Sequence, residues 1–252
     1  MKKIKLFNVS KRFGDLWAVK EVTLSILPSR ITGFIGPNGA GKTTLFHLIT
    51  GNLKPDSGKI FLEEEDITGL SPWKIAQKGI GRLFQDVRIF KNLSVLENVI
   101  VSLQERKFEN PFWAWTNPFY TRKIKNIYAE EAMHWLEFVG LENEKNKYAF
   151  ELSFGQQKLL SFARLMAGKY DVLLLDEPTA GVYPEMIKKI ENLLRKIIEE
   201  EKKTVAIIEH NMSVILNLAD WVYFMNEGKI AFFGRSDHVL FAKEVREIYV
   251  GI

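Results

Sequence analysis

The segment best suited to chemistry is a glycine-rich loop between an apolar run and a helical pattern. Residues 36–43 read Gly-Pro-Asn-Gly-Ala-Gly-Lys-Thr, after the apolar run Ile31–Ile35 and before a helix-like stretch at 43–50. Glycines let the backbone turn tightly with its N–H groups facing inward, and the N-terminus of the next helix adds positive charge. In such a loop Lys42 can reach the β- and γ-phosphates, and the Thr43 hydroxyl can bind Mg²⁺. The pattern predicts a nucleoside triphosphate site.

Two carboxylates follow a second apolar run. Residues 172–175 are apolar, and Asp176 and Glu177 come directly after them. Such a run is typical of a buried parallel strand, and ligands of open α/β sheets bind beyond the carboxyl ends of the strands. We therefore expect Asp176 to hold Mg²⁺, directly or through water, and Glu177 to polarise the attacking water.

Two further polar residues stand at the ends of strand-like runs. His210 follows the apolar residues 205–208, and Gln85 closes the run at 80–85. We expect His210 to contact the γ-phosphate or the attacking water. The uncharged amide of Gln85 can bind Mg²⁺ or position water.

A serine marks the start of a predicted helix farther along the chain. Ser153 precedes a stretch with Leu159, Leu160, Ala163 and Met166 at helical spacing. It fits an N-cap, and a Ser–Gly helix start can also grip phosphate. Capping alone and phosphate contact remain alternatives from the residues themselves.

Composition excludes several other classes of site. The 252 residues contain no cysteine, which rules out disulfides and thiolate zinc sites. The four histidines lack metal-binding spacing, so we expect no zinc enzyme. A net charge of +4 without a dense Lys/Arg tract does not favour a nucleic-acid partner. Nothing resembles a secretory signal or an 18-residue apolar span.

Hydrophobic periodicity divides the chain into a β-rich part and a helical part. Strand patterns are at 3–9, 21–27, 59–62, 80–85, 172–175 and 205–208, with a hairpin at 221–233 and a helix at 185–201. Helical stripes contain Leu96, Val99, Ile100 and Leu103, then Ile127, Met133, Leu136 and Val139, around an aromatic segment at 108–120. We predict one domain of 1–252: an α/β core from 1–93 and 169–240, a helical insertion at 94–168, and a short tail at 241–252.

The order of these motifs closely resembles the ATP-binding subunit of ABC transporters, over essentially the whole chain. The resemblance implies an ATPase with a P-loop NTPase fold: a RecA-like mixed β core, an antiparallel β subdomain and an inserted α-helical subdomain. It implies that Phe13, with Trp17 as a weaker candidate, stacks on adenine, although core packing of Phe13 is the alternative. It implies that ATP is bound by Phe13, Gly36, Pro37, Asn38, Gly39, Ala40, Gly41, Lys42, Thr43, Thr44, Ser153, Gly155 and Gln156. It further implies catalysis by Glu177, His210 and Gln85, and Mg²⁺ binding by Thr43, Gln85 and Asp176.

Within that family the chain is most similar to the branched-chain amino acid, or Liv-type, group. The similarity is carried by residues 117–120, 136–141, 180–184 and 245–251. A lipopolysaccharide-export ATPase ends similarly, but the long helical insertion argues against it. An ABC ATPase that does not transport is the other alternative. Two features count against it: the insertion lacks the sustained heptads of a coiled coil, and the chain contains one cassette. Phe154 and Tyr183 replace the glycine and aspartate usual in the family.

The resemblance also implies partners. ATP would lie between the glycine-rich loop of one subunit and Ser153, Gly155 and Gln156 of a second ATP-binding subunit, either a non-identical sister or a copy of this chain. Transmembrane permease subunits would supply the path, and an extracytoplasmic substrate-binding protein would act indirectly. This places the chain on the cytoplasmic face of the cell membrane as a peripheral subunit.

Overall fold

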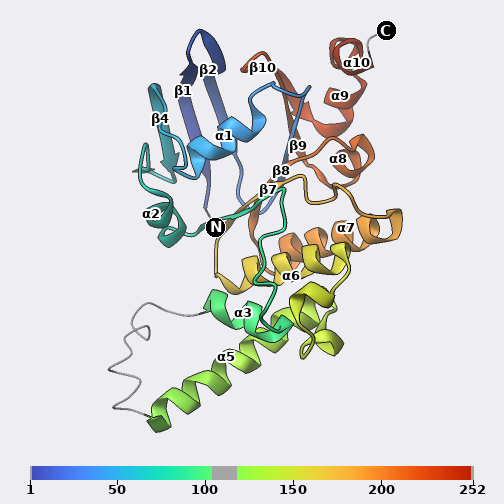
Figure 1. Ribbon diagram of the computed structural model, residues 1–252. Coiled ribbons are helices and arrows are strands. Elements are labelled where there is room, and N and C mark those ends of the chain that lie inside the picture. The colour runs from blue at the N-terminus through green and yellow to red at the C-terminus, as the bar shows by residue number, and fades with distance from the viewer. Residues whose placement is uncertain (1, 104–117, 251–252) are drawn as a thin grey trace. The chain divides into compact units, whose positions relative to one another are not determined.

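The computed structural model describes residues 2–103 and 118–250. The chain forms two compact units, one from Met1–Gln85 with Tyr170–Ile252 and the other from Asp86–Lys169 (Figure 1). The second unit contains the stretch that the sequence pattern assigns to a helical insertion, with its boundary at Asp86.

A six-stranded sheet of order β10-β9-β3-β8-β7-β6 forms the centre of the first unit. Its five strands from β9 to β6 run parallel, and β10 pairs with β9 in antiparallel fashion. The bounds are β3 (Ile31–Ile35), β6 (Ile80–Leu83), β7 (Val172–Asp176), β8 (Thr204–Ile208), β9 (Trp221–Asn226) and β10 (Lys229–Arg235). All residues of β3, β7 and β8 are buried, as expected of parallel strands covered on both faces.

A separate antiparallel sheet of order β2-β1-β4-β5 completes the β structure of this unit. It contains β1 (Ile4–Phe13), β2 (Leu16–Ile26), β4 (Ser57–Leu62) and β5 (Glu65–Asp66). The first two strands extend well beyond the predicted 3–9 and 21–27. The β1–β2 register shifts repeatedly between Leu6 and Arg12, and Asn8 and Glu21 have positive φ. These bulges interrupt the two-residue alternation on which strand prediction relies.

Helix α1 (Lys42–Ile49) joins the two sheets in one hydrophobic core. The core cluster contains residues of both sheets and of this helix. Phe34 of β3 meets Phe46 of α1 edge-on at 5.7 Å between ring centroids and stacks on Tyr223 of β9 at 5.6 Å. The loop before α1 is therefore attached to a rigid, buried support.

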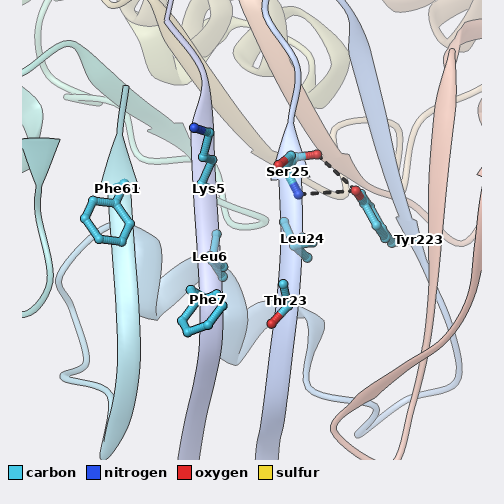
Figure 2. A pocket seen from close by; sticks show the side chains of 8 residues that line it. All are labelled: Lys5, Leu6, Phe7, Thr23, Leu24, Ser25, Phe61 and Tyr223. Carbon is cyan, nitrogen blue, oxygen red and sulfur yellow. Dashed lines mark hydrogen bonds between the residues drawn. The ribbon is translucent and has the colours of Figure 1, made fainter. Parts of the chain in front are cut away.

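Tyr223 also ties the six-stranded sheet to the edge of the antiparallel sheet. Its hydroxyl accepts a hydrogen bond from Ser25 N at 3.3 Å and donates one to Ser25 O at 3.1 Å. Figure 2 shows these bonds at one end of a shallow depression lined by Lys5, Phe7 and Phe61. Because β2 is an edge strand, the phenol satisfies backbone groups that no neighbouring strand pairs.

The remaining helices of the first unit flank the sheet. They are α2 (Pro72–Gln77), α7 (Pro184–Glu199), α8 (Met212–Leu218), α9 (Ser236–Phe241) and α10 (Lys243–Val250). Helix α7 begins with Pro184 in its first turn and buries Ile190, Leu193, Leu194 and Ile197, which are spaced as one face of a helix. In Figure 1, α8 and α9 lie beside the β9–β10 hairpin.

The second unit is helical. Helices α3 (Val95–Leu103), α5 (Pro118–Val139) and α6 (Phe154–Ala167) contact one another, with single 3₁₀ turns at Glu142–Glu144 and Ala149–Glu151. The prediction that Ile127 belongs to the core is wrong, because its side chain is 48% exposed. The buried side chains described for α5 are Ala132, Trp135, Leu136 and Val139, so the described packing is concentrated in the helix's last turns.

Two observations bear on the expected surroundings of the chain. No helix in the described ranges is both long and apolar enough to cross a bilayer. The aromatic segment at 108–120 lies outside the described residues, apart from the backbone at the start of α5.

Replacing Tyr223 with phenylalanine tests the link between the sheets. We expect Tyr223→Phe to lower the free energy of unfolding by about 1–2 kcal/mol, because it removes both bonds to Ser25. Burial raises the pKa of Tyr223 above its ordinary value of 10.0, so the stabilisation is complete below pH 10.0 and falls at higher pH as the unfolded chain ionises first. Urea titrations measure both effects. Tyr183→Phe is the control, because Tyr183 is 84% exposed, and an equal loss there would contradict the assignment.

Candidate active site

The carboxyl ends of four neighbouring parallel strands carry the residues singled out in the sequence. Strand β3 leads into the glycine-rich loop, β8 is followed by His210, β7 ends at Asp176, and β6 leads toward Gln85. Strand β6 stops at Leu83, so Gln85 lies just beyond the strand and not at its end as predicted. Because the strands run parallel and adjacent, these residues share one edge of the sheet.

Glycine is required at two positions of the loop because backbone atoms lie against them. Gly36 has φ of 147°, and a Cβ there would lie 2.1 Å from Met225 O. Gly41 has φ of 99°, and a Cβ there would lie 2.0 Å from Ala18 O. The loop is thus held between the start of β2 and the end of β9, with its backbone close enough to form a compact anion-binding turn.

The loop ends at an open helix start. Helix α1 begins at Lys42 with Gly41 as its N-cap, without a side-chain cap and without an acidic residue in its first turn. The first N–H groups of a helix lack intrahelical partners, and the helix dipole favours an anion there. Thr43 is exposed and Thr44 half-buried at this start, while Pro37, Asn38, Gly39 and Ala40 form the preceding turn.

Lys42 is buried beneath the loop. Its Nζ donates hydrogen bonds to Gly36 O at 2.7 Å and Pro37 O at 2.9 Å. Burial lowers the pKa of Lys42, and the nearby charges of Glu177 and Asp176 oppose that shift. The structure therefore places a cation, carboxylates and a helix start around one point, as the sequence predicted.

Asp176 forms a buried ion pair with a residue that the sequence analysis missed. Arg82 donates to Asp176 Oδ2 at 2.7 Å, and the two side chains are 5% and 4% exposed. The guanidinium also lies 4.8 Å from the centre of the Phe84 ring. Asp176 Oδ1 has no hydrogen-bond partner among the described residues. An unpaired carboxylate oxygen, together with the Thr43 hydroxyl and the Gln85 amide, fits the all-oxygen ligand preference of Mg²⁺.

Glu177 brings the three expected catalytic side chains together. His210 Nε2 lies 3.0 Å from Glu177 Oε1, and Gln85 donates to Glu177 Oε2 at 3.0 Å. Glu177 has φ of 47°, in the left-handed region that few non-glycine residues occupy. Such strain is common at functional sites. The geometry gives a carboxylate with a histidine and an amide at its two oxygens.

The serine-capped helix in the second unit forms as predicted. The Ser153 hydroxyl accepts from Gln156 N at 3.3 Å, and the Gln156 side chain accepts from Ser153 N at 3.0 Å. This capping box confirms Ser153 as the N-cap of α6. Gly155 lies in its first turn, and the Phe154 ring is half exposed, with Lys158 Nζ 5.4 Å from its centre.

Phe13 and Trp17 lie on either side of the β1–β2 turn. Phe13 is 48% exposed, which excludes the alternative that it is a core residue. Trp17 is also partly exposed and is paired with Arg12 across the strands. The next residue, Ala18, contacts Gly41 through its carbonyl, so both aromatic residues are on the strand ends beside the loop.

Two polar residues near the site, Arg82 and Glu209, were not predicted. Arg82 stands inside an apolar strand, which is a weak signal for a buried ion pair. Glu209 directly precedes His210. Its carboxylate accepts hydrogen bonds from the backbone N–H of His210 and from the backbone N–H and hydroxyl of Thr179. The sequence gives no sign that Glu209 is buried, because a single acidic residue after an apolar strand is normally a solvated turn residue.

Residues 19–180 match the family described as ABC transporter, which is more than half of the chain. The chain belongs to the ABC transporter family. It is an ATP-binding subunit of that family and an ATPase, as the motif order indicated.

Known proteins match this subunit over nearly its full length. The high-affinity branched-chain amino acid transport ATP-binding protein LivG of Escherichia coli is 35% identical over 95% of the chain and 94% of the relative. An ATP-binding cassette of an ABC transporter, solved in its ADP conformation, is 34% identical and superimposes with a TM-score of 0.85 over 100% of both chains. A second cassette, solved as a dimer in a post-hydrolysis state with ADP and phosphate, is 26% identical with a TM-score of 0.77 over 92% of this chain and 98% of that one. These matches confirm the ABC cassette fold and homology to the Liv-type group.

Breaking the Arg82–Asp176 pair should destabilise the protein strongly. We expect Arg82→Leu to lower the free energy of unfolding by about 3–5 kcal/mol, because it leaves a buried carboxylate without its counter-charge. Arg235→Leu is the control: its ion pair with Asp237 is exposed, and its loss should cost less than about 1 kcal/mol. Chemical denaturation without nucleotide measures both.

A second variant separates charge from packing. Adding Asp176→Asn to Arg82→Leu removes the unpaired charge and should recover part of the lost stability. No recovery would mean that the cost comes from lost packing around Phe84 and Phe46.

Proposed function

We propose that this subunit hydrolyses Mg²⁺-ATP at the sheet edge formed by β3, β8, β7 and β6. The observation that carries the proposal is the convergence of Glu177 with His210 and Gln85, across the edge from the buried Lys42. The loop N–H groups and Lys42 bind the phosphates. Phe13 stacks on the adenine. Bound Mg²⁺ would be held by Thr43, Gln85 and Asp176, and it neutralises phosphate charge.

In the hydrolytic step Glu177 acts as the general base. Its carboxylate orients a water molecule and accepts a proton as the water oxygen bonds to the γ-phosphorus and the bond to ADP breaks. His210 lies against Glu177 and donates toward the γ-phosphate as negative charge builds on it. Gln85 holds the other carboxylate oxygen, so Glu177 keeps one orientation before the reaction.

Pairing with a second ATP-binding subunit completes the nucleotide site. Ser153, Gly155 and Gln156 start α6 with an N-capped turn, which suits contact with the γ-phosphate of an ATP held by the partner. The relative solved as a dimer with ADP and phosphate supports such pairing. ATP then links pairing to binding, and hydrolysis weakens the pair. The partner is a non-identical sister or a second copy.

The proposed task is transport of branched-chain or other hydrophobic amino acids into the cell. The full-length relatives, whose names specify branched-chain amino acid transport, support this substrate class. The chain would act on the cytoplasmic face of the membrane beside permease subunits, with an extracytoplasmic substrate-binding protein acting indirectly. Gln85 is the last residue of the first unit, and Asp86 begins the second. This position suits a relay from the phosphate site to the permease-facing unit.

Replacing Glu177 with glutamine separates binding from hydrolysis. We expect Glu177→Gln to bind Mg²⁺-ATP within a few-fold of the wild-type affinity and to hydrolyse it about 10²–10⁴ times more slowly, because the amide cannot accept the proton. The trapped ATP should also hold the subunit in a pair, alone or with its sister. Phosphate release and sedimentation measure the two effects. Turnover at the wild-type rate would exclude Glu177 as the base.

Transport is tested in proteoliposomes that contain this subunit, its sister, the permeases and the binding protein. We expect leucine uptake only with ATP on the side of this subunit, and none with Lys42→Ala, which loses the cation of the phosphate site. ATP hydrolysis that leucine-loaded binding protein does not stimulate, with no uptake, would contradict the amino-acid assignment while leaving the ATPase intact.

A further inference from the structure

One buried carboxylate beside the active site has no part in the proposed reaction. Glu209 follows β8, directly before His210, and is 3% exposed. Its Oε1 accepts from Thr179 N at 2.9 Å and from the Thr179 hydroxyl at 2.6 Å, while its Oε2 accepts from His210 N at 3.2 Å. A charge so deeply buried is costly unless it is fully hydrogen-bonded. The carboxylate therefore fixes two segments to each other.

The two segments are those that carry the catalytic pair. Thr179 lies in the turn after Glu177, which is closed by a hydrogen bond from Ala180 N to Glu177 O at 3.2 Å. Glu177 N in turn donates to Ile208 O at 2.9 Å. A non-glycine residue with φ of 47° keeps that conformation only where its surroundings determine it. Glu209 and Ile208 supply those constraints from the neighbouring strand end.

We propose that Glu209 is a positioning residue for ATP hydrolysis, which holds the turn after Glu177 at a fixed place relative to His210. The inference rests on the proposed roles of Glu177 and His210. Because only 3% of Glu209 is exposed, we assign it no direct contact with the nucleotide or the attacking water. It acts through Thr179 on one side and the His210 backbone on the other, and so keeps the 3.0 Å contact between the catalytic side chains. A small displacement of the Glu177 carboxylate would slow proton transfer and leave phosphate binding intact.

Glutamine is the informative replacement at position 209 because it has the same shape and no charge. Its single carbonyl oxygen can accept from Thr179 N or from His210 N, but not from both ends of the site. In either orientation one backbone N–H faces the NH₂ group and loses its acceptor. Thr179→Val removes only the hydroxyl bond to Glu209 and keeps the backbone bond, so it weakens the same connection less.

Thr204→Val serves as the matched control. Thr204 is buried at the opposite end of β8, where its hydroxyl donates to Lys2 O at 2.9 Å and accepts from Ser29 N at 3.3 Å. Its replacement removes buried hydrogen bonds from the same strand, at the end of β8 opposite the catalytic edge. A merely structural effect of losing polar contacts should appear in this variant too.

The experiment measures kcat, KM for Mg²⁺-ATP, ADP affinity and unfolding midpoint for the full chain and each variant. We expect Glu209→Gln to lower kcat about 10–100-fold, with ADP affinity within about threefold of wild type. Thr179→Val should lower kcat less. The double variant should be no slower than Glu209→Gln alone, because both changes cut one link. Thr204→Val should lower the unfolding midpoint and leave kcat unchanged.

Several results would overturn the proposal. Turnover of Glu209→Gln within twofold of wild type would do so, as would an equal loss of kcat in Thr204→Val or strictly multiplicative losses in the double variant. If Glu209→Gln does not fold, an unchanged kcat in Thr179→Val overturns it instead. Wild-type and Glu177→Gln proteins are assayed alongside: a wild type without ATP hydrolysis overturns the proposed function as well, whereas active wild type with active Glu209 variants overturns only the positioning role.

Discussion

The whole arrangement depends on strands that run parallel in the order β3-β8-β7-β6. Parallel neighbours present their carboxyl ends at one edge, so residues distant in sequence become neighbours without any loop having to reach across the sheet. Lys42, Gln85, Glu177 and His210 gather there for this reason. The complete burial of β3, β7 and β8 makes that edge rigid. Short loops on a rigid edge leave these four side chains little freedom to separate.

Charge is concentrated at this edge and is balanced locally. Arg82 neutralises Asp176, while Glu177 and Asp176 favour the charged form of Lys42 against the effect of burial. Such pairs gain little net stability when they are made, but losing one partner is costly. Each charged side chain at this edge is therefore held in position by its charged neighbours. That dependence suits a site that must receive a triphosphate without rearranging.

The sequence predicted those parts of the fold and site that follow from local pattern. The glycine-rich loop, the apolar strands that lead to Asp176 and His210, and the Ser153 cap could all be predicted, because each pattern lies within a few residues. The long β1 and β2 strands were predicted too short, because bulges break the alternation.

What escaped prediction depends on contacts made only in three dimensions. The pairing of Arg82 with Asp176 requires the register of β6 against β7. The bonds of Glu209 to Thr179 require β7 and β8 to lie side by side. Ile127 matched a helical stripe, but a stripe does not reveal how far along a helix its packing partners extend. The roles of the site residues stay predictions until variants are measured.

Lys42 is hydrogen-bonded to two backbone carbonyls of its own loop, and this has a consequence for nucleotide exchange. An ammonium that is already bonded to Gly36 O and Pro37 O can trade those oxygens for phosphate oxygens one at a time. In the proposed site, a nucleotide would therefore exchange with these two backbone acceptors of Lys42. Under the proposed function, product release would then require no refolding of the loop that holds the phosphates.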